Sequence, residues 1–162
     1  MFELNRILVP VDFSECSERA LGVALSQAFR FDADVFLLHV ADRPGSKTYE
    51  DNAATAGVAE ALEADEAALI ELYDRVSKQV ADATGLPELA ESKRHLRIGG
   101  GTPAPEIVSA AEDANVDMII MGTHGRTSIK EFFVGSTAEQ VVKNATCAVL
   151  AVKPEGYPYL RD

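Results

Sequence analysis

Three glycines in the second half of the chain have a spacing that could build a phosphate-binding loop. Gly122 ends an apolar run, Gly125 follows three residues later, and Gly135 stands directly before Ser136 and Thr137 at the start of an expected helix. Glycine allows close backbone approach and positive φ. The free N–H groups and the dipole of a helix N-terminus attract anions. The spacing therefore predicts a cradle for phosphate.

Side chains near these glycines support this prediction but leave an alternative open. Ser136 and Thr137 offer hydroxyl donors, and Arg126 and Lys130 offer cations. Ser136 and Glu139 also form an S-x-x-E pattern, in which the two residues cap a helix start and need no ligand. Both interpretations, the phosphate cradle and the capping box, remain possible from the spacing alone.

Other nucleotide and hydrolase signatures are missing from the chain. It has no G-x-x-x-x-G-K-[ST] segment, no G-x-G-x-x-G after its first apolar run and no G-x-S-x-G elbow. Asp12 alone could suggest a phosphoacceptor receiver domain. That chemistry needs an aspartate at the end of the third strand, where this chain has Gly99-Gly100-Gly101. We therefore disfavour a P-loop, a dinucleotide fold, an α/β-hydrolase and a receiver.

The elements that must position the loop are predicted from the hydrophobic pattern. Short apolar runs predict buried strands, and apolar residues at a helical period, with caps at Ser14 and Thr102-Pro103 and a stop at Gly85, predict helices between them. Strands alternating with helices indicate a parallel sheet covered on both faces. The strands are expected at residues 7–11, 35–40, 94–98, 116–121 and 147–152, and the helices after residue 14, at 56–83, after 102 and at 136–144.

The fold class determines where a ligand would bind. In an open α/β sheet, ligands bind beyond the carboxyl ends of the strands, where the strand order reverses. Asp12, Val40 and the loop of residues 121–137 follow strands and fall in that region. Residues 41–55 have no clear period, and we expect a long loop there.

Composition and charge limit the classes of partner. The chain has 162 residues, enough for one domain, and a formal net charge of −11. That charge repels nucleic acid and anionic lipid, so we expect neither nucleic-acid nor membrane binding. The N-terminal residues contain neither a signal peptide nor a membrane span, so a cytoplasmic location is the default expectation.

The remaining residues that could do chemistry are explained more simply by packing. Cys16 lies in an expected first helical turn, and Cys147 lies in an apolar strand; they make neither a disulfide framework nor a zinc site. His39 is interpreted as a strand residue rather than a ligand. His124 lies inside the glycine loop, and a contact with phosphate is left open for it.

The glycine spacing also resembles a known family. The segment Gly122-x2-Gly125-x9-Gly135-Ser136 is similar to the G-2x-G-9x-G-[S/T] nucleotide-binding motif of the universal stress protein family. Residues 7–14 and 147–153 also resemble that family, although Ser128 and Ala148 replace its frequent glycine and proline. The resemblance implies the UspA-like, ATP-binding branch. It also implies a fold, the adenine nucleotide alpha hydrolase type, with a single open five-stranded sheet in the order 3-2-1-4-5 over residues 1–153 and a tail at 154–162.

The resemblance further implies a role for each site residue. Asp12 would hydrogen-bond the ribose or base, Val40 would meet the adenine through its backbone, and Met121 would lie under the base or ribose. Pro10 and Val11 would pack against the nucleotide. The ribose and phosphates would be held by Gly122, Gly125, Gly135, Ser136 and Thr137, and the expected nucleotide-binding set is completed by Thr123, His124 and Arg126.

The resemblance thus implies an ATP-binding stress protein, and we expect it to act as a nucleotide-dependent sensor or switch with an unknown downstream protein. The alternative is a dimeric interaction protein with an empty or vestigial pocket. We expect no catalytic residues and at most very slow ATP hydrolysis, because no general base has a sequence-evident partner. Mg²⁺ or Mn²⁺ would be held mainly through the phosphates, with no protein metal site. The apolar strand Cys147 to Val152 at a sheet edge predicts a homodimer.

Overall fold

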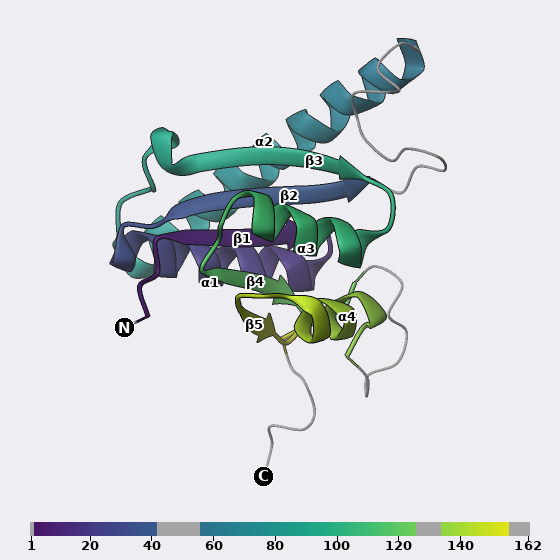
Figure 1. Ribbon diagram of the computed structural model, residues 1–162. Coiled ribbons are helices and arrows are strands. Elements are labelled where there is room, and N and C mark those ends of the chain that lie inside the picture. Colours follow the sequence, from purple (N-terminus) through teal and green to yellow (C-terminus); the bar gives the residue numbers. More distant parts are fainter. Residues whose placement is uncertain (1, 42–55, 126–133, 156–162) are drawn as a thin grey trace.

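A parallel sheet forms the centre of the molecule. The computed structural model describes residues 2–41, 56–125 and 134–155. The strands are β1 (Arg6–Val11), β2 (Asp34–Ala41), β3 (Arg94–Gly100), β4 (Met118–Gly122) and β5 (Ala148–Val152). They lie in the order β3-β2-β1-β4-β5, all parallel (Figure 1). The predicted α/β fold and its strand order are confirmed.

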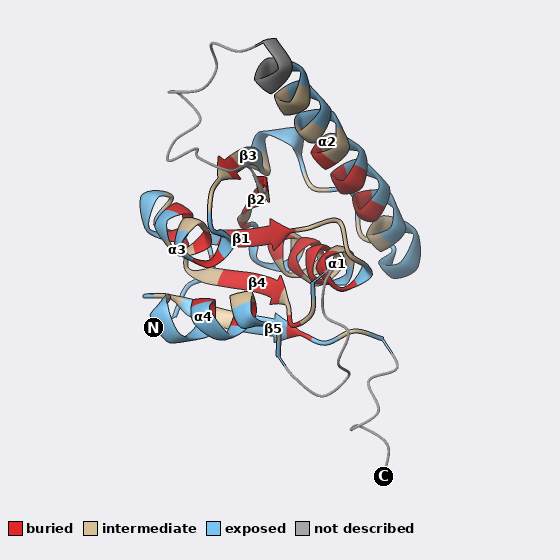
Figure 2. Ribbon diagram, turned by 90° about the vertical axis from the view of Figure 1, so that its right-hand side faces the viewer, coloured by how far each residue is buried: buried red, intermediate tan, exposed pale blue. Residues whose placement is uncertain are grey.

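Helices cover both faces of this sheet, as the alternation of strands and helices predicted. They are α1 (Glu15–Phe31), α2 (Ala56–Thr84), α3 (Pro103–Asp113) and α4 (Ser136–Asn144), with a 3-10 turn, η2, at Glu91–Lys93. Figure 2 shows α1 and α2 on one side of the sheet and α3 and α4 on the other. None of the described helices is long and apolar enough to cross a membrane.

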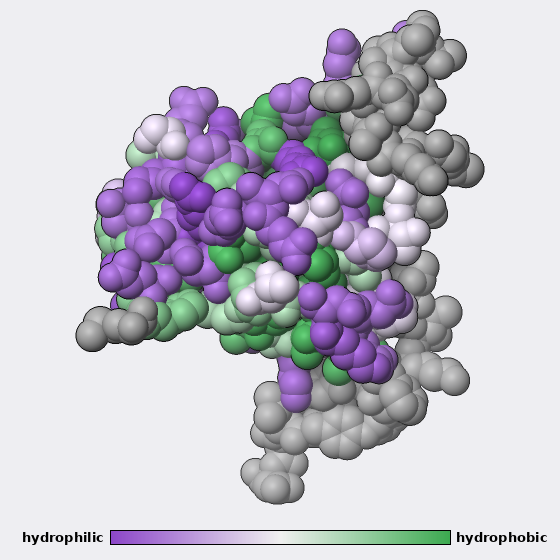
Figure 3. All heavy atoms as spheres, in the orientation of Figure 1, coloured by the Kyte–Doolittle hydropathy of each residue, from purple (hydrophilic) through white to green (hydrophobic). Residues whose placement is uncertain are grey.

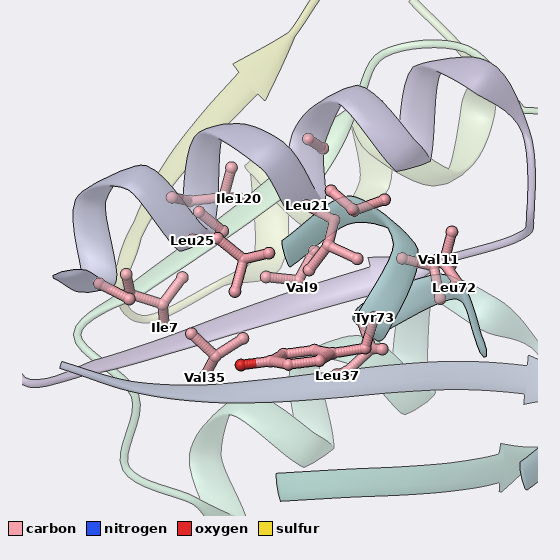
Figure 4. Close-up of a cluster of buried hydrophobic side chains, with 14 of the residues drawn as sticks. Ile7, Val9, Val11, Leu21, Leu25, Val35, Leu37, Leu72, Tyr73 and Ile120 are labelled. Atoms are coloured by element: carbon pink, nitrogen blue, oxygen red, sulfur yellow. The ribbon is translucent and has the colours of Figure 1, made fainter. Parts of the chain in front are cut away.

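The larger core lies between the sheet and the helices α1 and α2. Figure 4 shows side chains of β1 and β2 meeting those of α1, with the Tyr73 ring of α2 against them. Ile7, Val9, Val35 and Leu37 are fully buried there. Burial of such a side chain contributes about 1.5–3 kcal/mol, so this contact holds α1 firmly on the sheet.

The second core lies under α3 and α4, and the alternation of strand side chains produces it. Leu8 and Leu38 lie between residues of the first core along β1 and β2, and they point to the opposite face. There they pack with Ile107 of α3, Ile119 of β4 and Val141 of α4. The sheet is therefore buried on both faces, as its continuous apolar strands predicted.

Two strands begin later than the pattern predicts. β4 begins at Met118 rather than Val116, because Asn115 takes a left-handed turn with φ of 49°. The carboxylate of Asp117 then accepts the backbone N–H groups of Asn5 and Arg6, each at 2.8 Å. β5 likewise begins at Ala148 and excludes the half-buried Cys147.

The third strand ends later than predicted. Gly99 and Gly100 belong to β3 instead of a turn, and only Gly101 has a positive φ, of 106°. A Cβ atom at Gly99 would lie 2.7 Å from Cγ of Glu106 on α3. Gly99 therefore allows the edge strand and the first turn of α3 to approach.

The interpretation of Ser136 and Glu139 as a capping box is wrong. Gly135, not Ser136, is the N-cap of α4, and no side chain caps this helix. Glu139 instead accepts a hydrogen bond of 2.6 Å from Lys143 one turn later. The hydroxyl of Ser136 is therefore not used as a helix cap.

Candidate functional site

The site region opens where two central strands separate. β1 lies between β2 and β4, so the strand order reverses there, which is where this fold class binds ligands. β1 pairs with β2 along its whole length, but its recorded pairs with β4 are Ile7 with Met118 and Leu8 with Ile119. Beyond Leu8 the two strands diverge. Pro10, in the diverging part, has no N–H to donate to a ladder.

A cavity of about 650 Å³ lies at the carboxyl ends of these strands. Its volume falls within the ~300–1,000 Å³ of small-molecule sites. Its lining includes every predicted site residue except Arg126, which lies outside the described residues together with Ser128 and Lys130. The predicted residues gathered around it are Pro10, Val11, Asp12, Val40, Met121, Gly122, Thr123, His124, Gly125, Gly135, Ser136 and Thr137.

Asp12 is held by the residue that starts α1. Its Oδ1 atom accepts hydrogen bonds from the N–H and the hydroxyl of Ser14, at 3.1 and 2.5 Å. The Ser14 hydroxyl in turn accepts the N–H of Ser17 as the helix N-cap, which confirms the predicted cap. One oxygen of Asp12 therefore orients the carboxylate, and a short chain of bonds ties it to α1.

Gly125 lies directly against the other oxygen of Asp12. A Cβ atom at Gly125 would stand 2.7 Å from Oδ2 of Asp12, so any side chain there would displace the carboxylate. Neither Gly122 nor Gly125 has a φ in the left-handed range, and Gly135 has φ of −59°. Of the two properties that glycine allows, close approach and positive φ, these positions do not use the second. Gly125 is needed for close approach.

A glycine is needed at position 122 because of its close packing against Cys16. A Cβ atom there would lie 2.9 Å from Sγ and 3.0 Å from the carbonyl carbon of Cys16. The Cys16 thiol is buried and donates to the carbonyl of Val152 at 3.3 Å. Cys16 therefore packs the first turn of α1 onto the ends of β4 and β5.

Thr123 closes the base of the glycine loop. Its N–H donates to Val152 at 2.9 Å, and its carbonyl accepts the N–H of Gly135 at 2.7 Å. Its hydroxyl lies 2.8 Å from Nδ1 of His124. The two ends of the loop are thus fixed to each other and to β5, whatever path residues 126–133 take.

The N-terminus of α4 faces the same cavity. The first hydrogen bond of the helix runs from the N–H of Glu139 to Gly135 at 3.0 Å. Ser136, Thr137 and Ala138 come before Glu139, so their N–H groups lie ahead of the first helical hydrogen bond. All three residues line the cavity. Such N–H groups and the helix dipole favour an anion. The arrangement can therefore hold a phosphate at one side of the cavity and hydroxyl or amino donors at Asp12.

Four cavity residues were absent from the predicted site: Ser17, His39, Pro103 and Ala138. His39 is the most informative, because its Nδ1 lies 2.9 Å from the carbonyl oxygen of Val11. A carbonyl only accepts, so Nδ1 carries the proton. No pattern along the sequence indicates this contact, because it depends on the strand register, which pairs His39 with Val11 next to Asp12.

Phe13 connects His39 to the start of α1. Its ring lies 4.7 Å from that of His39, and its φ is 61°. A bulky residue in the left-handed region costs about 1–2 kcal/mol, and such strain gathers at functional sites. The strained turn lies between Asp12, which lines the cavity, and Ser14, which is hydrogen-bonded to Asp12.

No group of three or more His, Cys, Asp or Glu side chains in the described part of the chain could hold a metal ion. The acidic residue nearest the glycine loop in the described cavity is Asp12.

Known proteins resemble this chain over nearly its whole length. Residues 3–153 match the Universal stress protein family. The chain is 35% identical over 149 residues to Universal stress protein MJ0531 of Methanocaldococcus jannaschii, covering 92% of this chain and 82% of that protein. It is 34% identical to Universal stress protein MJ0577 of the same organism, covering 92% and 94%. The structure of UspA from Lactobacillus plantarum is similar with a TM-score of 0.69, 28% identity and coverage of 93% and 98%.

Proposed function

Because this chain belongs to the universal stress protein family, we propose that it binds ATP or another adenine nucleotide in the cavity at the carboxyl ends of the sheet. One observation supports the proposal most: the glycine motif, Asp12 and Val40, which are far apart in the sequence, line one cavity. The cavity combines a carboxylate, apolar strand ends and a helix N-terminus, three features that suit the ribose, base and phosphates of a nucleotide.

The charge of Asp12 determines the orientation in which the nucleotide binds. The Asp12 carboxylate repels phosphate, so it accepts from the ribose hydroxyls or an amino group of the base. The phosphates lie instead at the N-terminus of α4, against Gly135, Ser136 and Thr137. Val40 and Met121 flank the base or ribose from β2 and β4, and Pro10 and Val11 pack beside it.

Solved relatives bear on the class of ligand. One universal stress protein structure is a complex with cAMP, and one from Archaeoglobus fulgidus is a complex with dAMP. They are 21% and 22% identical to this chain, so the likeness establishes the fold alone. The choice of an adenine nucleotide for this chain rests on its own motif and cavity.

The bound nucleotide would serve a cytoplasmic stress-response switch rather than a metabolic reaction. Rapid hydrolysis needs a positioned base or water-orienting group and a charge clamp on the γ-phosphate. In the described cavity His124 is the candidate base, and its Nδ1 atom lies against Thr123. Mg²⁺ or Mn²⁺ would enter with the phosphates. A downstream protein would read the nucleotide state.

We also propose that the protein is a homodimer through β5. Leu150 on this edge strand and Val142 on the neighbouring α4 are 40% and 54% exposed. Figure 3 shows hydrophobic residues exposed low on the face that carries α4 and β5. An apolar sheet edge pairs readily with a second copy. If the cavity held no nucleotide, this surface would favour the alternative function, a dimeric interaction protein.

The test is whether the purified protein carries or binds a nucleotide. The protein is denatured, and the supernatant is read by ultraviolet absorbance and mass spectrometry. We expect adenine nucleotide in it, or ATP binding by calorimetry once the cavity has been emptied. A protein that neither carries nor binds any adenine nucleotide would refute the switch and leave the interaction role.

A further inference from the structure

An apolar hollow lies at the amino ends of the strands, away from the nucleotide cavity. It has a volume of about 550 Å³ and is walled by the N-terminal segment, the last turns of α1 and parts of β4 and β5. Phe2, Phe31 and Leu150 line it and are 62%, 57% and 40% exposed. An exposed apolar patch of this kind marks an interaction site on a soluble protein.

The hollow is continuous with the open side of β5. Leu150 is the middle residue of that strand, and β5 is the last strand in the sheet order. Ala148, at the start of β5, pairs with Met118 of β4, which also lines the hollow. Whatever pairs with the β5 edge therefore passes beside the hollow.

We propose that the C-terminal segment of a second copy, residues 156–162, covers this hollow. The proposal rests on the homodimer through β5 proposed above. The segment lies outside the described residues and reads Gly-Tyr-Pro-Tyr-Leu-Arg-Asp, so Tyr157, Tyr159 and Leu160 supply apolar side chains for an apolar site. Pro158 limits the backbone freedom that binding removes.

Antiparallel pairing brings the segment to the right end of the molecule. A two-fold axis at Leu150 sets Val152 of the second copy opposite Ala148, because the two strands run in opposite directions. Neighbouring strands are about 4.8 Å apart, so the second copy leaves the sheet about 10 Å from β4. At that level of β4, Met118 lines the hollow.

The length of chain after β5 is sufficient for this contact. Ten residues follow Val152, from 153 to 162. Fully extended they reach about 33–36 Å, several times the distance to the hollow. The same segment could reach the hollow of its own chain only by turning back along β5, and it would then occupy the edge that the dimer needs.

The same axis joins the hollows of the two copies. Directly opposite residues in an antiparallel pair point to the same face of the sheet. The two Leu150 side chains therefore meet on the face that carries α1, and the two hollows become one apolar trough. Each tail closes the half of the trough that belongs to the other copy.

Cross-linking between different chains tests where the segment binds. A tagged chain with Phe31→Cys is mixed with an untagged chain with Tyr159→Cys, and the mixture is treated with a mild oxidant such as oxidised glutathione. We expect a disulfide-linked pair of one tagged and one untagged chain on a non-reducing gel. Val142→Cys replaces Phe31→Cys in the control, because Val142 is 54% exposed but lies on α4, on the opposite face. A control pair that cross-links equally well would overturn the proposal, as would closure within one chain that carries both cysteines.

Truncation separates the tail contact from the dimer itself. Sedimentation equilibrium gives the dimer dissociation constant of the full chain, of a chain ending at Glu155 and of Leu150→Asp. We expect the truncated chain to dimerise at least tenfold more weakly and Leu150→Asp to be monomeric. An unchanged dissociation constant for the truncated chain would overturn the tail contact and leave the β5 dimer standing. A monomeric full chain that binds ATP would overturn the tail contact and the dimer but not the nucleotide site.

Discussion

The backbone of Gly125 lies so close to Asp12 that a Cβ atom on the glycine would stand 2.7 Å from the Oδ2 oxygen. The other oxygen of Asp12 is fixed by Ser14 at the start of α1. Asp12 is therefore held between the first helix and the glycine loop. This contact joins Asp12 to the glycine motif, although the two are separated by more than 100 residues in the sequence.

Gly125→Ala should weaken ATP binding by at least tenfold, which is about 1.4 kcal/mol. The methyl group must push the Asp12 carboxylate or the loop away from its position. Calorimetric titration with ATP measures the loss. Gly22→Ala is the matched control, because its Cβ would lie at ordinary distances of 3.7 and 3.8 Å from Val76 and Val80. It should leave binding unchanged and raise the free energy of unfolding by about 0.5–1 kcal/mol, since alanine favours a helix interior.

Asp12→Ala should weaken ATP binding by roughly 0.5–1.5 kcal/mol through the loss of one hydrogen bond to the nucleotide. Its bonds to Ser14 also disappear, so part of any change could come from the start of α1. Ser14→Ala separates the two effects: it removes the N-cap, costs about 1 kcal/mol of stability and keeps the carboxylate. Equal losses of ATP affinity in the two variants would assign Asp12 a structural role only.

Gly135→Val should reduce ATP binding at least tenfold, about 1.4 kcal/mol, without unfolding the protein. The φ and ψ of Gly135, −59° and 146°, suit any residue, so the valine side chain acts by entering the space where phosphate would lie. Gly135→Ala should have a smaller effect. Thermal unfolding of both variants should match that of the unaltered chain, and an early transition would show that the loop base had been disrupted instead.

The hydrophobic pattern predicted a parallel α/β sheet, and the family resemblance implied its strand order. The residues expected at the site line one cavity, because they follow strands whose carboxyl ends meet. The alternating apolar runs define the strands, and the glycine spacing, Asp12 and Val40 fall where the topology brings strand ends together. The sequence did not predict that His39 lines the cavity, because its position depends on a contact between two strands. It also did not predict the left-handed Phe13, whose strain the surrounding packing must offset. Both features arise from tertiary contacts. Local propensity in fact disfavours the left-handed conformation of Phe13.

Acid should weaken the contact between α1 and α2. Arg75 donates to both carboxylate oxygens of Glu18, at 2.8 and 2.9 Å, and this bond lowers the pKa of Glu18 below its usual 4.5. A carboxyl whose pKa is lowered by folding stabilises the protein above about pH 4.5, and this stability is lost as the pH falls through the folded pKa. The pair is 29% and 46% exposed, so about 0.2–1 kcal/mol is at stake.

The acid effect is measured by urea unfolding between pH 3 and 7. Arg75→Gln should flatten the decrease below pH 4.5, because the bond that lowers the pKa of Glu18 in the folded protein is then lost. Lys78→Gln removes the same charge from the same helix and keeps the Glu18 contact. If both variants follow the pH profile of the unaltered chain, the ion pair contributes nothing measurable.

Mg²⁺ should bind the protein only together with the nucleotide. The described residues contain no group of acidic and histidine side chains suited to a metal ion, and magnesium commonly binds through substrate phosphates and water. Calorimetry with MgCl₂ alone should therefore give no saturable heat, whereas ATP should bind more tightly when Mg²⁺ is present. Saturable binding of Mg²⁺ to the nucleotide-free protein would point to ligands in residues outside the described ranges.

ATP turnover should be far below the ~1–100 s⁻¹ typical of kinases. His124, one of the two histidines that line the cavity, has its Nδ1 atom 2.8 Å from the hydroxyl of Thr123, so that nitrogen is engaged beside the loop base. Asp12 is oriented by Ser14 and lies on the side of the cavity where phosphate is disfavoured. A steady-state phosphate-release assay on the isolated protein decides the question. Turnover near 1 s⁻¹ that His124→Ala abolishes, with ATP affinity unchanged, would make the protein an enzyme. Slow or absent turnover in both proteins, with ATP bound equally by each, is what a nucleotide switch requires.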